Sequence, residues 1–338
     1  MDSHDRHNRI VLALLAVLLP VGVLFSMTLG RYAISVGDVA RILAGIILSV
    51  EKTWPPMAEN IVWQVRLPRI LAAVLVGAAL SVSGAAYQSA FHNPMAAPDV
   101  LGASSGAGFG AALAILHGQG SFAVMAAAFS GGLACVGLAL LAARLSRADR
   151  VLSLILAGML ATSLFQAGTS YLKLIADPRN TLPEITYWLM GSLSGVKSAE
   201  LRLLALPLLL GFLPIFLLRW RMNLLALGDI EARSLGVNPA RVRLILIVCS
   251  TLLTATSVAL CGVVGWVGLV VPHLARRLVG SDGRALLPAS FLLGGLFLLL
   301  VDDLARSLYT TELPLGILTA VIGAPFFLLL LSRRGGTA

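Results

Sequence analysis

The chain alternates between long apolar runs and short polar connections, a pattern that predicts a bundle of membrane-spanning helices. A transmembrane helix needs about 20 mostly apolar residues, because the hydrocarbon core of a bilayer is about 30 Å thick. The expected spans are 10–29, 66–90, 99–116, 122–143, 151–175, 201–219, 241–261, 265–279, 286–304 and 313–332. These ten spans predict an all-α polytopic membrane protein. Their even number places both termini on one side of the membrane.

Two places in this pattern interrupt a span. Pro98 disfavours a helical residue before it, and Asp99 can cap the helix that follows. The second interruption is the glycine-rich segment 262–268. A long helix followed by a broken short one therefore occurs twice, at 66–116 and at 241–279, starting from opposite faces of the membrane. Paired interrupted segments in two inverted halves indicate a transport pathway.

The third span contains a possible catalytic motif, because Gly102-Ala-Ser104-Ser-Gly106 fits the G-x-S-x-G pattern of serine hydrolases. A nucleophile elbow needs a strand before the serine, whereas a proline-rich turn precedes it here. The small residues recur every four positions, at Gly102, Gly106, Gly110, Ala114 and Gly118. Small residues on one helix face allow close packing in lipid. We interpret the motif as a packing face. An intramembrane serine protease, with His273 from another span, is the less favoured alternative.

Composition supports the membrane assignment. The chain is 58% hydrophobic and 12% charged, against about a quarter charged in a soluble domain. We expect residues 1–338 to form one transmembrane domain. The net charge of +9 does not indicate nucleic-acid binding, because no basic stripe alternates with aromatic residues. The three cysteines lie inside apolar runs, so no disulfide, metal site or bound cofactor is predicted.

The distribution of basic residues sets the expected orientation. With both termini in the cytoplasm, most of the 25 lysines and arginines fall in cytoplasmic connections, as the positive-inside tendency requires. Five basic residues are exceptions, because they lie between the first two spans on the outer side. They are Arg31, Arg41, Lys52, Arg66 and Arg69.

The sequence shows no energy source for transport. No lysine follows a glycine, so a G-x-x-x-x-G-K phosphate loop is absent. Ionisable residues inside the membrane would indicate ion coupling. The main candidates are Asp302 and Asp303, near the outer end of a span, so a secondary transporter of a small solute is an alternative. The connection 222–241 mixes leucines with charged residues and predicts short amphipathic helices that contact a partner.

Four stretches carry a specific resemblance. They are "WQVRLPRILAAVLVGAALSVSGAAYQSAFHNPMAAPDVLGASSGAG" at 63–108, "ALGDIEARSLGV" at 226–237, "GWVGLVVPHLARRLVGSDGRALLPAS" at 265–290, and "LVDDLAR" with "ELPLGILTAVIGAPFF" within 300–327. The chain resembles the membrane subunits of type II ABC importers, which carry iron-siderophores, haem or cobalamin. The resemblance implies a ten-helix permease of the bacterial inner membrane that forms a homodimer around a central path. It also implies two cytoplasmic ATPase subunits, which use the ATP, and a periplasmic substrate-binding protein.

The resemblance further implies roles for particular residues. The loop that contacts the ATPase would contain Gly228, Asp229, Glu231, Ala232, Leu235 and Gly236. The cytoplasmic gate would contain Asn93, Met95, Val151, Leu152 and Ser153. The arginines that receive acidic residues of the binding protein would be Arg66, Arg69 and Arg306. The permease itself would have no catalytic residue. The expected cargo is an iron complex or a cobalamin-like chelate, although relatives of this kind also carry oxyanions.

Overall fold

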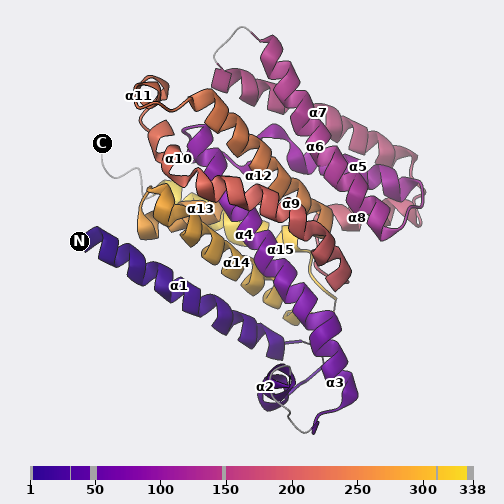
Figure 1. The fold of residues 1–338 in the computed structure, drawn as a ribbon. Coiled ribbons are helices and arrows are strands. Elements are labelled where there is room, and N and C mark those ends of the chain that lie inside the picture. The colour runs from indigo at the N-terminus through magenta and orange to yellow at the C-terminus, as the bar shows by residue number, and fades with distance from the viewer. Residues whose placement is uncertain (1–2, 31, 46–51, 147–149, 310, 333–338) are drawn as a thin grey trace.

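The computed structural model describes residues 3–30, 32–45, 52–146, 150–309 and 311–332, and these residues contain helices and no strands (Figure 1). Seven helical stretches are long and apolar enough to cross a membrane. The α-helices of these stretches are α1 (Ser3–Thr28), α4 (Leu67–Ala90), α6 (Ser121–Leu145), α7 (Arg150–Ile175), α9 (Ser198–Leu217), α12 (Pro239–Cys261) and α14 (Gly283–Ser307). The shorter helices at predicted spans are α5 (Ala103–Leu116), α13 (Val267–Val279) and α15 (Leu315–Ser332). Each of the ten predicted spans therefore coincides with a helix.

Several short helices lie between the spans, and the sequence pattern predicted only those of the 222–241 connection. These are α10 (Arg219–Leu225) and α11 (Asp229–Ser234). The others are α2 (Val36–Ala44), α3 (Pro56–Asn60), α8 (Thr181–Met190), the π-helix η1 (Ile61–Arg66) and the 3₁₀ helix η2 (Pro98–Leu101). Because α3 and η1 run directly into α4, the predicted span 66–90 is part of a longer helical stretch from Pro56 to Ala90.

Both interruptions occur where the sequence places them. After α4, His92 has a positive φ of 50°, and Gly102 adopts the left-handed conformation immediately before α5. Asp99 caps α5 as predicted, since its Oδ1 accepts a hydrogen bond of 2.8 Å from the backbone N–H of Ser104. After α12, Gly262 and Trp266 have positive φ values of 73° and 69°, and α13 then begins.

The two interruptions lie at opposite ends of the bundle. The first is beside α10, because the His92 ring hydrogen-bonds the carbonyl oxygen of Leu225. The second is at the other end, where Ser192 N–H donates to Cys261 O at 2.7 Å. The packing is reciprocal: α4 contacts α13, and α12 contacts α5. The fold therefore has the two inverted halves that the sequence predicts. We refer to its two ends as the α11 end and the α2 end (Figure 1).

Small residues bring helix backbones into direct contact. A Cβ on Gly106 would lie 2.2 Å from Gly131 O, and one on Gly110 would lie 2.1 Å from Ala127 O. The packing interpretation of the G-x-S-x-G stretch is confirmed at these positions. Gly102 and Gly118 lie outside α5 and have positive φ values of 79° and 64°, so neither belongs to the predicted helix face. Gly102 is nevertheless closely packed, since a Cβ there would lie 2.4 Å from Thr162 Oγ1, whereas nothing lies within 4 Å of the Cβ position of Gly118.

The closest approach joins the two halves. A Cβ on Gly84 of α4 would lie 1.7 Å from the carbonyl oxygen of Gly268 in α13. We expect Gly84→Ala to destabilise the protein by about 3 kcal/mol or more, because backbone atoms cannot move aside as a flexible side chain can. Gly137→Ala on α6 is the matched control, since nothing lies within 4 Å of its Cβ position. Thermal unfolding in detergent measures both variants. Equal melting temperatures would contradict the prediction.

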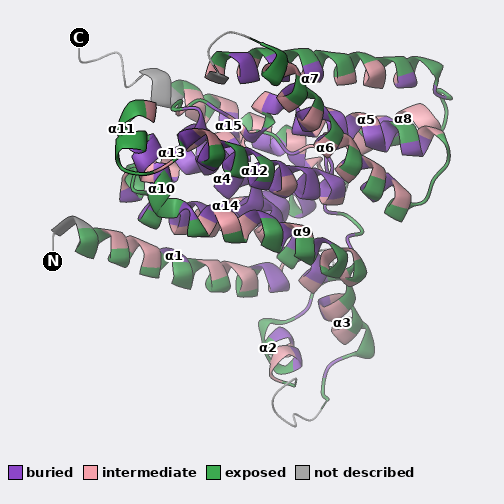
Figure 2. Cartoon of the chain, turned by 45° about the horizontal axis from the view of Figure 1, so that its top comes forward, coloured by how far each residue is buried: buried purple, intermediate pink, exposed green. Residues whose placement is uncertain are grey.

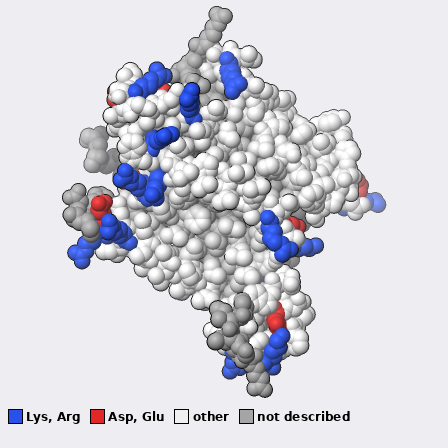
Figure 3. Space-filling view, in the orientation of Figure 1, with Lys and Arg blue, Asp and Glu red and all other residues white. Residues whose placement is uncertain are grey.

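The burial pattern separates central from peripheral helices (Figure 2). In the most apolar window of each span, 83% of the residues are buried in the α3–α4 stretch and 72% in α12. The corresponding shares are 17% in α1 and 28% in α7. Lysines and arginines gather toward the two ends of the molecule, with a broad uncharged belt between them (Figure 3). This arrangement suits a lipid-embedded protein, whose apolar surface faces the hydrocarbon.

Candidate functional site

The α11 segment is a short helix held by glycines at both ends. Gly228 precedes it with a φ of 114°, and Gly236 follows it with a φ of 79°. The N–H of Gly236 bonds Arg233 O and the N–H of Val237 bonds Ala232 O, both at 3.0 Å. These two bonds form a Schellman motif, which requires the left-handed conformation at Gly236. Ala232 is fully buried and fixes the helix against the bundle.

Three large apolar side chains project from this segment into the open. Leu227 is 59% exposed, Ile230 is 79% exposed and Leu235 is 56% exposed. Asp229 and Glu231 lie among them. Apolar side chains grouped within so short a segment are typical of a surface that another protein covers. The sequence prediction of a partner-contacting loop places Leu235 on this surface, together with Leu227 and Ile230.

One buried arginine links this segment to the rest of the protein. The Arg243 side chain, on α12, is only 3% exposed. Its Nη2 donates to Asp229 Oδ1 at 2.9 Å, and its Nε donates to Ala90 O at 2.7 Å. The hydrogen bond from Arg243 lowers the pKa of Asp229. A single guanidinium therefore connects α11 to the last residue of α4, immediately before the Asn93 turn.

The sequence interpretation missed Arg243, which it counted only as one of the basic residues of a cytoplasmic connection. A signal was present, because Arg243 shares a helix face with Leu246, Ile247 and Ser250, at spacings of three, four and seven residues. An arginine on the buried face of an apolar helix requires a partner, since a buried unpaired charge is very costly.

The predicted gate residues come from two segments that lie close together. In the first, Asn93 Oδ1 accepts a hydrogen bond of 2.9 Å from Met95 N–H, and Met95 is 41% exposed. In the second, at the start of α7, Leu152 is 50% exposed and Ser153 is buried. Residues beside both segments, including Ala96 and Leu154, share one hydrophobic cluster. The structure thus brings the two segments into one packing unit, and their gating role stays a prediction.

The arginines predicted to dock a binding protein lie at the α2 end, and all three are buried. Arg66 is 3% exposed, Arg69 is 8% exposed and Arg306 is 6% exposed. Arg66 donates to the carbonyl oxygens of Met27 and Tyr32. These guanidinium groups are therefore engaged within the chain, which the sequence alone did not predict.

Carboxylates supply most of the remaining partners of this cluster. Arg69 donates to Asp302 through Nε and Nη2, at 2.9–3.1 Å, and to Glu312 Oε1 at 2.9 Å. Arg306 pairs with Asp303. Two guanidinium groups, those of Arg69 and Arg306, thus pair with three carboxylates, while backbone carbonyl oxygens hold Arg66, which explains why buried arginines are tolerated at this end. Their role in docking a binding protein stays a prediction. Their ion pairs and hydrogen bonds hold the ends of α1, α4 and α14 together, which is a structural role.

A polar groove runs along α5 and α7 toward the α2 end. Its cavity measures about 420 Å³, and its lining includes Ser105, Gln166, Thr169, Ser170 and Lys173. Gln166 Nε2 donates to Ser105 Oγ at 3.4 Å, which joins the two helices. Hydroxyl and amide groups in the middle of a long apolar helix are unfavourable against lipid. Such a groove is typical of a water-accessible path or of a contact with another protein.

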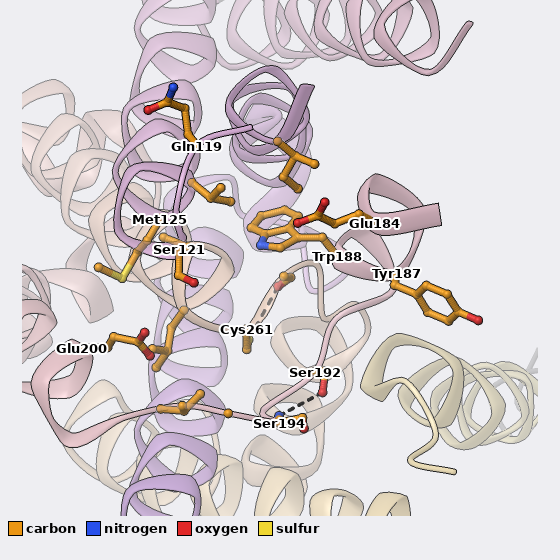
Figure 4. A pocket seen from close by; sticks show the side chains of 17 residues that line it. Gln119, Ser121, Met125, Glu184, Tyr187, Trp188, Ser192, Ser194, Glu200 and Cys261 are labelled. Carbon is orange, nitrogen blue, oxygen red and sulfur yellow. Dashed lines mark hydrogen bonds between the residues drawn. The ribbon is translucent and has the colours of Figure 1, made fainter. Parts of the chain in front are cut away.

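A second cavity, of about 270 Å³, lies at the α2 end between α5, α6, α8, α9 and α12 (Figure 4). Glu184 and Trp188 reach it from α8, and Glu200 lies on its opposite side. The segment 175–193, to which the sequence assigned no residue roles, supplies part of this lining. Glu200 Oε2 accepts from the N–H of Lys197 and so also caps α9.

The described residues contain no group of three or more His, Cys, Asp or Glu side chains that could hold a metal ion. Cys135, Cys249 and Cys261 are buried and form no disulfide. Within the described part of the chain, the candidate site therefore consists of the exposed apolar surface at α11, the two predicted gate segments, the polar groove and the cavity at the α2 end. A multi-helix membrane fold with inverted interrupted helices and a protruding apolar loop defines a transport subunit.

Comparisons with known proteins identify the family. The FecCD transport family matches residues 18–333, and the chain belongs to that family. It is 40% identical over 334 residues to the molybdate import system permease protein MolB of Haemophilus influenzae, covering 98% of both chains. It is 39% identical over 341 residues to the vitamin B12 import system permease protein BtuC of Escherichia coli, again covering 98% of both.

A third relative and a solved structure agree with this assignment. A protein of Helicobacter pylori named "Probable iron chelatin transport system permease protein" is 42% identical over 276 residues, covering 82% of this chain and 83% of that protein. A solved structure described as an inward-facing metal-chelate type ABC transporter matches with a TM-score of 0.86 and 39% identity. The match covers 96% of this chain and 99% of that one. The predicted type II ABC importer permease fold is confirmed, and the protein is a multi-pass membrane permease of an ABC importer.

Proposed function

We propose that the chain works as a homodimer whose two copies enclose a central translocation path, with two ATPase subunits at the α11 end. The exposed Leu227, Ile230 and Leu235 carry this proposal, because they form an apolar surface for the ATPase beside a buried link to the gate turn. ATP hydrolysis belongs to the partner subunits, and the permease transmits their movement.

The proposed orientation places the α11 end and both termini in the cytoplasm of a bacterial cell, and the α2 end in the periplasm. The support is the number of exposed arginines at the α11 end, including Arg219, Arg221, Arg241 and Arg277, since cytoplasmic loops favour basic residues. A periplasmic binding protein would then dock at the α2 end, near the cluster of Arg66, Arg69 and Arg306.

The proposed cargo is an iron complex, a ferric siderophore or haem, or a cobalamin-like chelate. Relatives named for iron chelatin and vitamin B12 support this class. The relative named for molybdate supports an oxyanion as the second candidate. The lining of the polar groove suits either cargo, because its hydroxyl and amide groups and Lys173 can contact oxygen-rich ligands of both kinds. Identification of the ligand bound to the co-purified binding protein decides between them.

The two alternatives from the sequence lack structural support. Asp302 and Asp303, the candidates for ion coupling, form ion pairs with Arg69 and Arg306. Ser104, the candidate nucleophile, lines two cavities whose described lining residues include no histidine. A secondary transporter and an intramembrane protease are therefore not favoured.

Leu235→Asp tests the proposed ATPase contact. We expect cargo-stimulated ATP hydrolysis by the reconstituted importer to fall at least about tenfold, because the substitution places a charge in an apolar contact. The fold should not change, since Leu235 is exposed. Ser234→Asp is the control, because Ser234 is an exposed polar neighbour in α11. Import driven by a proton gradient without an ATPase subunit would contradict the proposed function.

A further inference from the structure

A third cavity, of about 320 Å³, lies at the α11 end between the C-terminal end of α6 and the starts of α7 and α12. Its polar lining consists of two arginines and two serines, namely Arg144, Arg243, Ser146 and Ser153. Among the described residues that line it, none is Asp or Glu. Asp229 pairs with Arg243 from outside this lining, so Arg144 is the arginine of the cavity that has no carboxylate partner among the described residues.

The two arginines are suited to different parts of one binding site. Arg243 is buried and held in a fixed direction by Ala90 O and Asp229. Its guanidinium has five N–H donors, more than these partners use. Arg144 is exposed and forms no ion pair or hydrogen bond with any residue that the structure describes. A fixed guanidinium and a free one that line the same cavity can both donate hydrogen bonds to one anion.

The other lining groups also favour an anion in this cavity. Ser153 Oγ donates to Ser146 Oγ at 2.9 Å, so the two hydroxyl groups form a small polar wall. Helices α7 and α12 both begin at this cavity, and the N-terminal ends of helices carry partial positive charge. Leu154, Leu244 and Ile247 line the apolar side of the cavity, and Leu244 is 38% exposed.

We propose that this cavity is a binding site for a phosphate-like oxyanion. Guanidinium and hydroxyl donors match the tetrahedral oxygens of such a group, and the volume is sufficient for it. The group can belong to a free oxyanion in the aqueous phase or to the headgroup of an anionic lipid, since basic pockets between helices at the cytoplasmic side bind such headgroups. A bound oxyanion would share Arg243 with Asp229 and would lie beside Ser153 of the predicted gate.

Equilibrium binding of radiolabelled inorganic phosphate tests the site directly. The full-length chain is placed in phosphatidylcholine nanodiscs without nucleotide, and Arg144→Gln is compared with Arg241→Gln. Arg241 is an exposed arginine at the same end that does not line the cavity. We expect Arg144→Gln to weaken binding about tenfold, the loss of one charge-assisted hydrogen bond, and Arg241→Gln to bind like the wild type. Ser153→Ala should also weaken binding, by a smaller factor.

A second arm of the experiment distinguishes the two sources of the oxyanion. Protein from nanodiscs that contain phosphatidylglycerol is analysed by native mass spectrometry for bound lipid. If the Arg241→Gln variant keeps a bound phosphatidylglycerol and the Arg144→Gln variant loses it, the cavity binds a lipid headgroup. Phosphate binding in pure phosphatidylcholine that depends on Arg144 identifies a site for a free anion. Competition by molybdate then tests whether the site also accepts other tetrahedral oxyanions. If Arg144→Gln and Arg241→Gln behave alike in both arms, the proposal is wrong. Because the comparison of Arg144→Gln with Arg241→Gln needs no binding protein, ATP or transport, this outcome is independent of the proposed import function.

Discussion

Arg69→Met will remove most of the folded permease from the membrane. Asp302 is completely buried, and the substitution leaves its carboxylate without the three hydrogen bonds that Arg69 donates. Breaking one side of a buried ion pair costs about 3–5 kcal/mol, which is a large part of the total stability of a typical domain. Membrane-inserted protein, measured by fluorescence-detected size exclusion of a tagged chain, should fall severalfold.

Two further variants give this prediction its controls. Arg69→Met combined with Asp302→Asn should recover part of the folded protein, because the completely buried carboxylate is then replaced by a neutral amide and only the partly exposed Glu312 loses its partner. Arg41→Met removes an exposed arginine at the same end, whose side chain bonds only Thr53 Oγ1 among the described residues, and should have little effect. A single Arg69→Met variant that folds as well as the wild type would show that the ion pair is not structural.

Arg243→Gln should separate ATP hydrolysis from transport. The guanidinium is the direct connection between Asp229 in α11 and Ala90 at the end of α4, and glutamine is too short to hold both. We expect import in proteoliposomes to fall at least about tenfold while basal ATP hydrolysis is retained, because the exposed residues proposed to contact the ATPase remain unchanged. Arg243→Lys should recover part of the import. Equal loss of import and basal hydrolysis would instead indicate a general folding defect.

The pH dependence of this connection follows from the pKa of Asp229. Arg243 lowers that pKa, so the carboxylate is ionised in the folded protein above about pH 4, the ordinary range for aspartate. The stabilisation is present above the pKa of the unfolded state and is lost as the pH falls through the lower folded value. The ratio of import to ATP hydrolysis should therefore stay constant from pH 8 to pH 5. Asp229→Asn, which removes the carboxylate charge, should lower that ratio at neutral pH as protonation of Asp229 would.

Much of the fold could be predicted because membrane helices have strong local signals. Apolar runs, Pro98 and the glycines at 262–268 correctly located the spans and both interruptions. The helix α8 and the helices α2 and α3 could not be located in this way, because they lie outside the apolar runs. Their positions depend on tertiary contacts, such as the hydrogen bond from Ser192 to Cys261 beside α8.

The candidate site was predicted less completely, since long-range pairing leaves little trace in the local sequence. Arg69 and Asp302 are 233 residues apart in the chain, so nothing near Arg69 indicated that its guanidinium is buried in an ion pair. The sequence placed Arg69 at the outer end of its span, and the structure places it at the α2 end, buried rather than open to a partner. The short helices on both sides of Gly228, by contrast, follow from a local amphipathic pattern and were correctly predicted, although the exposed Leu227 and Leu235 lie in the turns that flank α11.

The contact between Gly84 and Gly268 also limits how this protein can move. With backbone against backbone at that point, α4 and α13 cannot slide or rotate past each other without atomic overlap. α12 and α14 also pack against α4, so we expect these four helices to move together as one body. Alternating access must then come from displacement of this body as a whole and from bending of the helices at its margin. Among the helices outside this body, α7 lines the polar groove and is largely exposed, with 28% of its most apolar window buried. We therefore expect α7 to bend during the transport cycle.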